Sequence, residues 1–154
     1  MLKENSKAPD FTLKKQDGQS VTLSQFEGTP VVLYFYPKDD TPGCTKEACS
    51  FRDGYSEYEK LGAKIIGVSP DSVESHEKFQ SKYSLPFTLL ADTDHKVSEA
   101  YGVWAKKKNF GREYFGIKRT TFLIDRDGMI AKVFEGVKPA NHSDEVLTAL
   151  KEIG

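Results

Sequence analysis

The sequence contains two cysteines, Cys44 and Cys49, and the setting of the first favours thiol chemistry. An apolar run, TPVVLYFYP, leads into the polar turn KDDTPG, and Cys44 then opens a stretch with helical spacing of apolar residues. A thiolate in the first turn of a helix is stabilised by unpaired backbone N–H groups and by the helix dipole. Cys44 also lies four residues before Ala48 on the apolar side of that helix. Taken alone, it therefore fits either a reactive thiol or a small buried hydrophobic residue.

The elements that position Cys44 follow an α/β pattern. Buried strands are predicted from three continuous apolar runs, TPVVLYFYP, AKIIGVSP and LPFTLLAD. Hairpins are predicted over FTLKKQDGQSVTL and TTFLIDRDGMIAKVFEG, each with an Asp-Gly turn. Ser24-Gln25-Phe26 is interpreted as a helical turn or a loop, and WAKKKNFGREYFGIK as an excursion loop without a steady period. Helices are predicted at about residues 44–60, from a cap within 69–71 to residue 83, at 95–102 and at 143–153. This order predicts a central mixed β-sheet with helices on both faces and an N-terminal β-hairpin.

Length and composition limit the class of protein. The chain has 154 residues, so we expect one domain over residues 1–154. Lys and Arg number 22 and Asp and Glu 23, a balance that predicts neither a nucleic-acid nor a membrane partner. The segment MLKENSKAPD lacks the apolar core of a signal peptide, and the longest apolar run is far too short to span a membrane. Two cysteines are too few for a disulfide scaffold, so we expect a cytoplasmic protein.

The histidines carry weaker signals. His76, His95 and His142 are far apart in the sequence, and we expect surface or capping roles for them. Two cysteines at this spacing without a paired histidine do not form a zinc pattern, and no glycine-rich phosphate loop occurs. We therefore expect no metal and no organic cofactor.

Two charged segments are interpreted as structural. The lysine run at residues 106–108, with Trp104 and Phe110 beside it, is interpreted as a solvated loop rather than a nucleic-acid contact. Asp39 and Asp40 are interpreted as turn residues rather than as an acid–base pair.

The segment around Cys44 resembles the active-site loop of the peroxiredoxins, whose signature is Pro-x-x-x-Thr-x-x-Cys. Here the pattern reads Pro37, Thr41 and Cys44 without departure. The wider string TPGCTKEAC resembles the bacterioferritin-comigratory-protein or PrxQ branch, in which a second cysteine commonly follows five residues later, as Cys49 does. The resemblance extends over most of the chain, through APDFTL, VVLYFYP, IIGVSPD and KRTTFLIDRDG with its Arg119.

This resemblance implies a thioredoxin-like fold and a thiol peroxidase that reduces hydrogen peroxide and organic hydroperoxides in antioxidant defence. It assigns Cys44 as the peroxidatic nucleophile and Cys49 as the resolving thiol, in a monomer recycled by thioredoxin or a similar dithiol reductant. Arg119 is expected beside the sulfur, where its guanidinium offers fixed donors to thiolate and peroxide. Thr41 is expected to place its hydroxyl beside the sulfur and the peroxide. Pro37, which has no N–H, is expected to keep water from the nucleophile.

The five-residue spacing of the cysteines predicts motion. On an ideal helix it corresponds to about 500° of rotation and a rise of about 7.5 Å, so the two Cα atoms lie roughly 9 Å apart. A disulfide requires Cα atoms within about 7 Å. Our hypothesis is that the helix unwinds locally once Cys44 is a sulfenic acid, which lets Cys49 attack it. Gly43 and Gly54 weaken the helix there, although Gly54 also fits a simple break into two helices.

Two alternatives stay open at this point. In the first, Cys49 faces solvent without a catalytic role, and an external thiol resolves the sulfenic acid. In the second, the chain is a redox sensor whose disulfide signals without turnover. A disulfide oxidoreductase is disfavoured, because such enzymes usually carry Cys-x-x-Cys and four residues separate the cysteines here.

Overall fold

The computed structural model of the chain describes residues 2–139 and 142–153. Its strands are β1 (Thr12–Lys15), β2 (Ser20–Thr22), β3 (Val31–Phe35), β4 (Lys64–Ser69), β5 (Thr88–Ala91), β6 (Trp104–Asn109), β7 (Arg112–Ile117), β8 (Thr120–Ile124) and β9 (Ile130–Glu135). Its helices are the 3₁₀ turn η1 (Leu23–Phe26), α1 (Pro42–Asp53), α2 (Tyr55–Lys60), α3 (Val73–Tyr83), α4 (Lys96–Ala100) and α5 (His142–Ile153).

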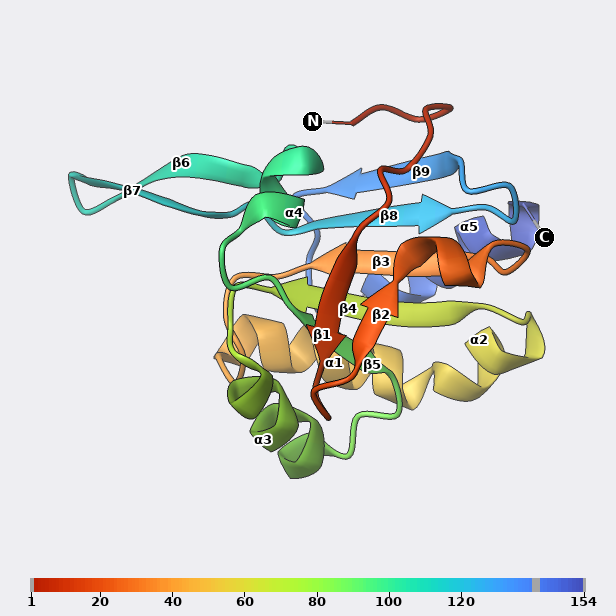
Figure 1. Cartoon of the computed structure of the whole chain (residues 1–154), viewed down its shortest axis with the longest axis horizontal. Coiled ribbons are helices and arrows are strands. Elements are labelled where there is room, and N and C mark those ends of the chain that lie inside the picture. The colour runs from red at the N-terminus through yellow and green to blue at the C-terminus, as the bar shows by residue number, and fades with distance from the viewer. Residues whose placement is uncertain (1, 140–141, 154) are drawn as a thin grey trace.

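Seven strands form one mixed sheet in the order β2-β1-β5-β4-β3-β8-β9 (Figure 1). At its centre β3, β4 and β5 are parallel, and β8 pairs with β3 in the antiparallel direction, with Thr120 opposite Phe35. The N-terminal hairpin β1-β2 extends the sheet beyond β5. The predicted mixed sheet and N-terminal hairpin are confirmed. Because β8 begins where β3 ends, the segments that follow β3 and precede β8 meet at one end of the sheet.

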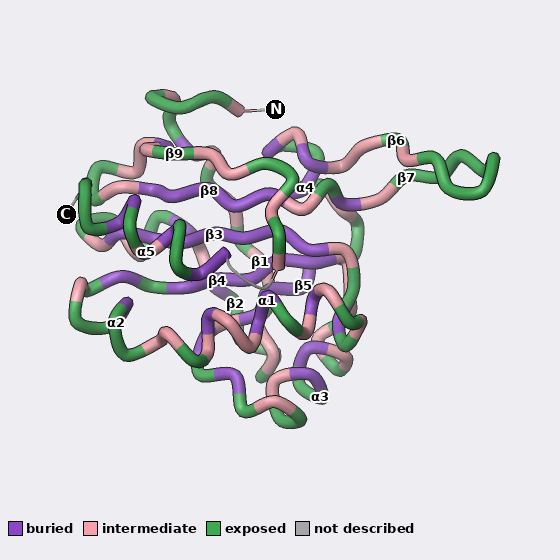
Figure 2. Tube along the Cα trace, turned by 180° about the vertical axis from the view of Figure 1, so that it is seen from behind, coloured by how far each residue is buried: buried purple, intermediate pink, exposed green. Residues whose placement is uncertain are grey.

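Strand β3 lies in the middle of two cores. Its side chains alternate across the sheet, with Val32 and Tyr34 in one core and Val31, Leu33 and Phe35 in the other. All five residues are buried, and the central strands form the continuous buried layer of Figure 2. This explains why the sequence of β3 is apolar without alternation, as expected for a strand covered on both faces.

Helices cover both faces of the sheet, as predicted. Phe51 of α1, Tyr58 of α2, Phe79 of α3 and Leu150 of α5 pack together in the core that contains Tyr34. The other core receives side chains from η1, α4 and the segment before β1. Among the described residues, no helix has both the length and the apolar character needed to cross a bilayer.

The single helix predicted over residues 44–60 is two helices. It begins two residues earlier, at Pro42, because proline suits the first helical position and Thr41 takes the cap position. Gly54 separates α1 from α2, and a Cβ at this position would lie 3.1 Å from Ser143 Oγ of α5. The break at Gly54 is thus confirmed, and it coincides with a close approach of α5. The predicted cap of α3 was wrong by one residue, since Ser72 Oγ accepts the hydrogen bond from the Ser75 amide.

The interpretation of WAKKKNFGREYFGIK as an excursion loop was wrong. Strands β6 and β7 pair from Trp104 opposite Ile117 to Asn109 opposite Arg112, and this hairpin projects from the body of the molecule (Figure 1). Its two-residue turn has positive φ at Phe110 (52°) and Gly111 (78°). Phenylalanine is an uncommon residue for that conformation, so the usual Asn-Gly or Asp-Gly signal was missing.

Gly67 in β4 generates the first prediction. A Cβ there would lie 2.8 Å from Tyr34 Cζ and 3.0 Å from Leu89 Cδ2, both in buried side chains. Gly67→Ala should therefore lower the free energy of unfolding by about 1–3 kcal/mol, the usual range for overpacking, in urea denaturation. Gly116→Ala is the matched control, because its Cβ would meet Tyr114 only at an ordinary 3.5 Å. Equal stability of Gly67→Ala and the unsubstituted protein would contradict this account of the core.

Candidate active site

Cys44 is the third residue of α1, directly after the loop that follows β3. It is only 2% exposed and belongs to the core that contains Tyr34. Its amide is one of the helix N-terminal N–H groups without an intrahelical partner, and the first turn of α1 contains no acidic residue. The helix dipole therefore favours negative charge at this sulfur.

Arg119 reaches Cys44 from the start of β8, the strand that pairs with β3. It immediately precedes β8, whose first residue lies opposite Phe35 at the end of β3. Its Nη2 donates a hydrogen bond to Cys44 Sγ over 3.1 Å. A Cβ at Gly43 would lie 3.3 Å from Arg119 Nη2, so the absence of a side chain there leaves room for the guanidinium. The expectation that Arg119 stands beside the sulfur agrees with this geometry.

Glu47 completes the site, and the sequence interpretation missed it. Arg119 Nη1 donates to Glu47 Oε1 over 2.6 Å, so one guanidinium links the carboxylate to the Cys44 sulfur. Glu47 is fully buried, and its Oε2 has no hydrogen-bond partner among the described residues. The available signal was its position three residues after Cys44, which places a carboxylate on the buried side of α1.

Burial and charge act in opposite directions on this pair. Burial raises the pKa of Glu47 to about 7, although the Arg119 charge and hydrogen bond oppose the shift. For Arg119, burial alone would lower the pKa, but the negative charges of Glu47 and Cys44 outweigh burial and raise it. Arg119 therefore remains a cation beside the sulfur, and Glu47 can hold a proton near neutral pH.

Thr41 and Pro37 lie in the loop before Cys44. Among the described residues, neither makes a hydrogen bond to the sulfur. The Thr41 hydroxyl donates to the carbonyl of Lys38 over 2.9 Å, and its own carbonyl accepts from the Thr45 amide. Pro37 is half-buried in the bend directly after Tyr36. The expected contact between Thr41 and the sulfur is therefore absent from the hydrogen bonds of the described residues.

Cys49 lies on another side of α1 from Cys44. It is half-buried, and both thiols are free within one intact helix. Cys49 lines an open groove between α1, α2 and the start of α5, where Ser50, Gly54 and Ser143 are among its neighbours. The two cysteines are thus arranged as the helical spacing predicts, with one in the core and the other toward the surface.

Comparisons with known proteins identify the family. Residues 5–133 match the model of the AhpC/TSA family. The chain belongs to that family. It is 55% identical over 147 residues to peroxiredoxin Bcp of Bacillus subtilis, covering 96% of this chain and 94% of the relative. Identity to peroxiredoxin Bcp of Escherichia coli K12 is 49% over 151 residues, covering 98% and 97%.

Solved structures agree with this assignment. A mutant of Xanthomonas campestris peroxiredoxin Q superposes with a TM-score of 0.90 at 42% identity, covering 94% of this chain and 92% of that one. A mutant of Xylella fastidiosa PrxQ gives a TM-score of 0.91 at 34% identity, covering 99% and 98%. The resemblance to the Bcp/PrxQ branch and the predicted thioredoxin-like fold are thus confirmed. The protein is a thiol peroxidase, which acts on peroxides and requires a thiol reductant.

In this peroxiredoxin Asp39 lies in a turn, as the sequence predicts, and it also anchors the loop before Cys44. Its carboxylate accepts hydrogen bonds from Tyr36 Oη (2.5 Å) and Ser75 Oγ (2.8 Å) and lies 2.7 Å from His76 Nδ1. Its amide donates to Asp71 Oδ2 over 2.7 Å. The loop is therefore fixed to β3, to α3 and to the segment after β4.

Asp40 adds a second attachment of the same loop to α3. Lys82 Nζ and Tyr83 Oη each lie 2.7 Å from its carboxylate oxygens. Asp40 has a positive φ of 54°, a strained conformation for a residue with a side chain. Because two adjacent aspartates bind opposite ends of α3, the backbone leading to Thr41 is held in place.

The expectation of surface or capping roles was wrong for two of the three histidines. His76 is fully buried between Asp39 and the carbonyl of Leu90. His142 is fully buried against Thr121 Oγ1, although its other nitrogen also contacts Glu145 in the first turn of α5. His95 is half-buried and stacks on Trp104 with ring centroids 4.0 Å apart. Polar partners from distant segments, the Leu90 carbonyl and Thr121 Oγ1, allow these burials, and no local pattern indicates them.

One cluster brings potential metal ligands together without making a site. Ligand atoms of Asp39, Asp71 and His76 lie within 4.8 Å of one another. However, Asp39 Oδ2 and Asp71 Oδ2 already accept hydrogen bonds from within the protein, and both nitrogens of His76 have partners. The cluster is explained by its role in fixing the loop.

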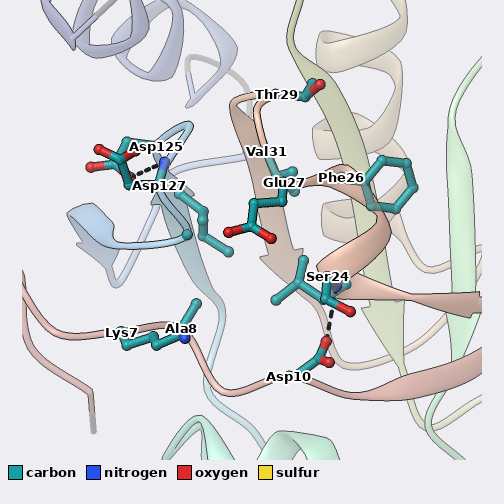
Figure 3. A pocket seen from close by; sticks show the side chains of 13 residues that line it. Lys7, Ala8, Asp10, Ser24, Phe26, Glu27, Thr29, Val31, Asp125 and Asp127 are labelled. Carbon is teal, nitrogen blue, oxygen red and sulfur yellow. Dashed lines mark hydrogen bonds between the residues drawn. The ribbon is translucent and has the colours of Figure 1, made fainter.

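A separate cavity opens at the opposite end of the sheet (Figure 3). It lies beside Val31, the first residue of β3, whereas Cys44 follows the last. Acidic side chains around it serve local structure, since Asp10 accepts from the Ser24 amide and Asp125 from the Asp127 amide. This cavity is not part of the active site.

Glu47 generates a prediction about pH. Between pH 4.5 and about 7 the unfolded chain releases this proton while the folded protein retains it, so rising pH lowers the free energy of unfolding. The loss is at most about 3 kcal/mol and is complete above the folded pKa. Glu47→Gln should abolish this part of the pH dependence in urea denaturation at pH 5 and pH 8.

Exposed Glu59 provides the control, because Glu59→Gln should leave the pH dependence unchanged. The pKa of His142 is lowered, mainly by burial, so His142 contributes a rise of stability with pH in all three proteins. An identical pH dependence in Glu47→Gln and the unsubstituted protein would contradict the raised pKa of Glu47.

Proposed function

We propose that Cys44 is the peroxidatic nucleophile of this thiol peroxidase. The observation that carries the proposal is the hydrogen bond from Arg119 Nη2 to the sulfur of a buried cysteine at a helix N-terminus. The thiolate attacks the hydroxyl oxygen of the hydroperoxide, an S–O bond forms and the O–O bond breaks, and the departing alkoxide or hydroxide takes a proton from solvent to give an alcohol or water. Sulfur is oxidised to a sulfenic acid, and the peroxide is reduced by two electrons.

Arg119 stabilises both partners of this step. Its guanidinium lies beside the thiolate before the reaction, and the same fixed donors face the negative charge that develops as the O–O bond breaks. Glu47 holds the other side of the guanidinium and so fixes its orientation. Glu47 is a positioning residue in this proposal, because its contact is with Arg119.

Thr41 and Pro37 shape the approach to Cys44. The Thr41 hydroxyl donates its hydrogen bond to the Lys38 carbonyl, so the lone pairs of Thr41 Oγ1 can accept a hydrogen bond from the O–H of a hydroperoxide. Pro37 follows a fully buried residue and offers no N–H that would retain water near the sulfur. Both residues belong to the loop that Asp39 and Asp40 hold against α3.

Cys49 is the resolving thiol in this proposal. Its sulfur attacks the Cys44 sulfenic acid, a disulfide forms, and water leaves. The attack requires α1 to unwind between the two cysteines, because an intact helix keeps their Cα atoms too far apart. Cys49 is already accessible from the groove beside α5.

We also propose how the cycle closes and where it runs. Thioredoxin or a similar dithiol protein reduces the Cys44–Cys49 disulfide, and the single domain works as a monomer in the cytoplasm without a metal or organic cofactor. Two free cysteines fit a reducing compartment. Organic hydroperoxides are included as substrates because a neighbour, the Xanthomonas campestris bacterioferritin comigratory protein, has alkyl peroxide reduction activity (42% identity, TM-score 0.88).

Substitution of each cysteine tests these roles. Cys44→Ser should consume no hydrogen peroxide in a single turnover, because the nucleophile is missing. Cys49→Ser should retain the stoichiometric first oxidation but lose turnover with thioredoxin by a factor of about 100 or more, the scale of losing one catalytic group. Both are measured as peroxide consumption by reduced protein, with and without thioredoxin. Sustained thioredoxin-supported turnover by Cys49→Ser would reject intramolecular resolution, and consumption by Cys44→Ser would reject the nucleophile.

Circular dichroism tests the unwinding of α1. Oxidation with one equivalent of peroxide should decrease the helical signal, since the 12 residues of α1 include both cysteines. Cys49→Ser is the control, because it reaches the sulfenic acid but has no bridge to hold α1 unwound, so its helical signal should decrease less. An unchanged signal in oxidised protein, with the disulfide confirmed by mass, would contradict unwinding.

A further inference from the structure

The hairpin of β6 and β7 is positioned to serve the active site. We call residues 104–117 the arm. It leaves the body where β3 ends and β8 begins, and Ile117, its last residue, lies two residues before Arg119. Figure 1 shows the arm projecting beyond that end of the sheet. A partner bound to the arm is therefore placed beside the Cys44 end of the molecule.

The arm exposes aromatic side chains. Phe110 at the turn is 97% exposed, Phe115 60% and Tyr114 47%. Among the described residues the only other large hydrophobic side chain so exposed is Ile153 on α5. The base of the arm is held by Trp104, which stacks on His95 and on Phe115. Exposed aromatic residues gathered on one supported element are typical of a protein-binding surface.

The arm also differs in charge from the rest of the chain. It contains four basic residues and one acidic residue, whereas the whole chain has a net charge of −1. Within the arm, Glu113 pairs with Lys106, and no ion pair within the described residues involves Lys108 or Arg112. A complementary partner therefore presents negative charge beside an apolar area.

Lys107 is the partly buried basic residue of the arm. Lys107 lies opposite Tyr114. Both side chains lie over Gly116, where an added Cβ would be 3.5 Å from Tyr114 and 3.6 Å from Lys107. Burial lowers the pKa of Lys107, the Arg119 charge lowers it further, and the Cys44 charge raises it. The arm thus extends from the end of the sheet near Arg119 to its turn at Phe110.

We propose that the arm is the docking surface for the protein dithiol reductant, one whose surface near its thiols is acidic and partly apolar. This rests on the proposed disulfide cycle. The reductant thiolate attacks the Cys44–Cys49 disulfide, which releases one enzyme thiolate and leaves the other sulfur in a mixed disulfide with the reductant. The second reductant thiol then attacks the mixed disulfide and releases the other enzyme thiolate. The reductant is oxidised to its disulfide, and both enzyme thiols are restored.

The geometry favours this occupant over two others. The six residues of β6 span about 20 Å, so a small hydroperoxide at Cys44 does not reach Phe110, whereas a protein covers both. A second copy of this chain that paired arm against arm would bring like charges together. One sulfur of the disulfide belongs to Cys44, which lies at the end of the sheet from which the arm projects.

The test uses an arm variant that leaves the residues near Cys44 intact, Lys108→Glu with Phe110→Ser and Arg112→Glu. A matched control makes the same change of charge and apolarity elsewhere, with Lys14→Glu, Lys78→Glu and Ile153→Ser. Three rates are measured for each protein: single-turnover peroxide consumption, turnover with dithiothreitol and turnover with thioredoxin over a range of salt concentrations.

The arm variant should lose about tenfold or more in kcat/KM for thioredoxin, mainly through KM, because charge and apolar complementarity are lost. Its single-turnover rate and its turnover with dithiothreitol should stay unchanged, as should all rates of the control. Phe110→Ser alone should lose part of the kcat/KM for thioredoxin. This single variant provides the test if the triple variant does not fold.

Three results would overturn the proposal: an unchanged kcat/KM for thioredoxin in the arm variant, an equal loss with dithiothreitol, or a dimer of the unsubstituted protein that the arm variant abolishes. The last would identify a second copy as the occupant. Failure of the proposed disulfide cycle is distinguishable, because the unsubstituted protein would then show no turnover with thioredoxin, or Cys49→Ser would retain that turnover.

Discussion

The guanidinium of Arg119, shared between a sulfur and a buried carboxylate, is the interaction on which the active site depends. It joins two segments 75 residues apart, since it binds Cys44 at the start of α1 and itself precedes β8. The antiparallel register of β8 on β3 fixes that meeting, and Gly43 leaves the space for it. A buried thiolate without this cation would lose its water without a compensating charge. The central sheet is therefore part of the chemistry as well as of the fold.

Much of this arrangement could be predicted from the sequence because the signals are local. Continuous apolar runs mark strands covered on both faces, and Asp-Gly turns mark the two predicted hairpins. The arm was missed because its turn uses Phe110 before Gly111, and Glu47 and His76 were missed because their partners are distant in sequence. Burial of a charged or polar residue depends on such partners, and helical spacing shows only which side of the helix the residue takes.

In the proposed cycle, the helix that stabilises the thiolate also opposes formation of the disulfide. Cys44 benefits from the N-terminal turn of α1 only while that turn is intact, yet the same geometry separates it from Cys49. Several features confine the disruption to α1. Gly54 ends this helix before α2, so unwinding need not extend into the packing of Tyr58. The low helix preference of Gly43 acts in the same direction at the other end.

The loop before Cys44 supplies the fixed side of this movement. Asp39 is bound to Tyr36, Ser75 and His76, and Asp40 to the last turn of α3, and none of these partners belongs to α1. If α1 unwinds as proposed, these contacts have no reason to break, so Pro37 and Thr41 keep their places. Arg119 likewise keeps its place before β8. In the proposed cycle the site then reassembles around Cys44 after each reduction, because its parts outside α1 have remained in position.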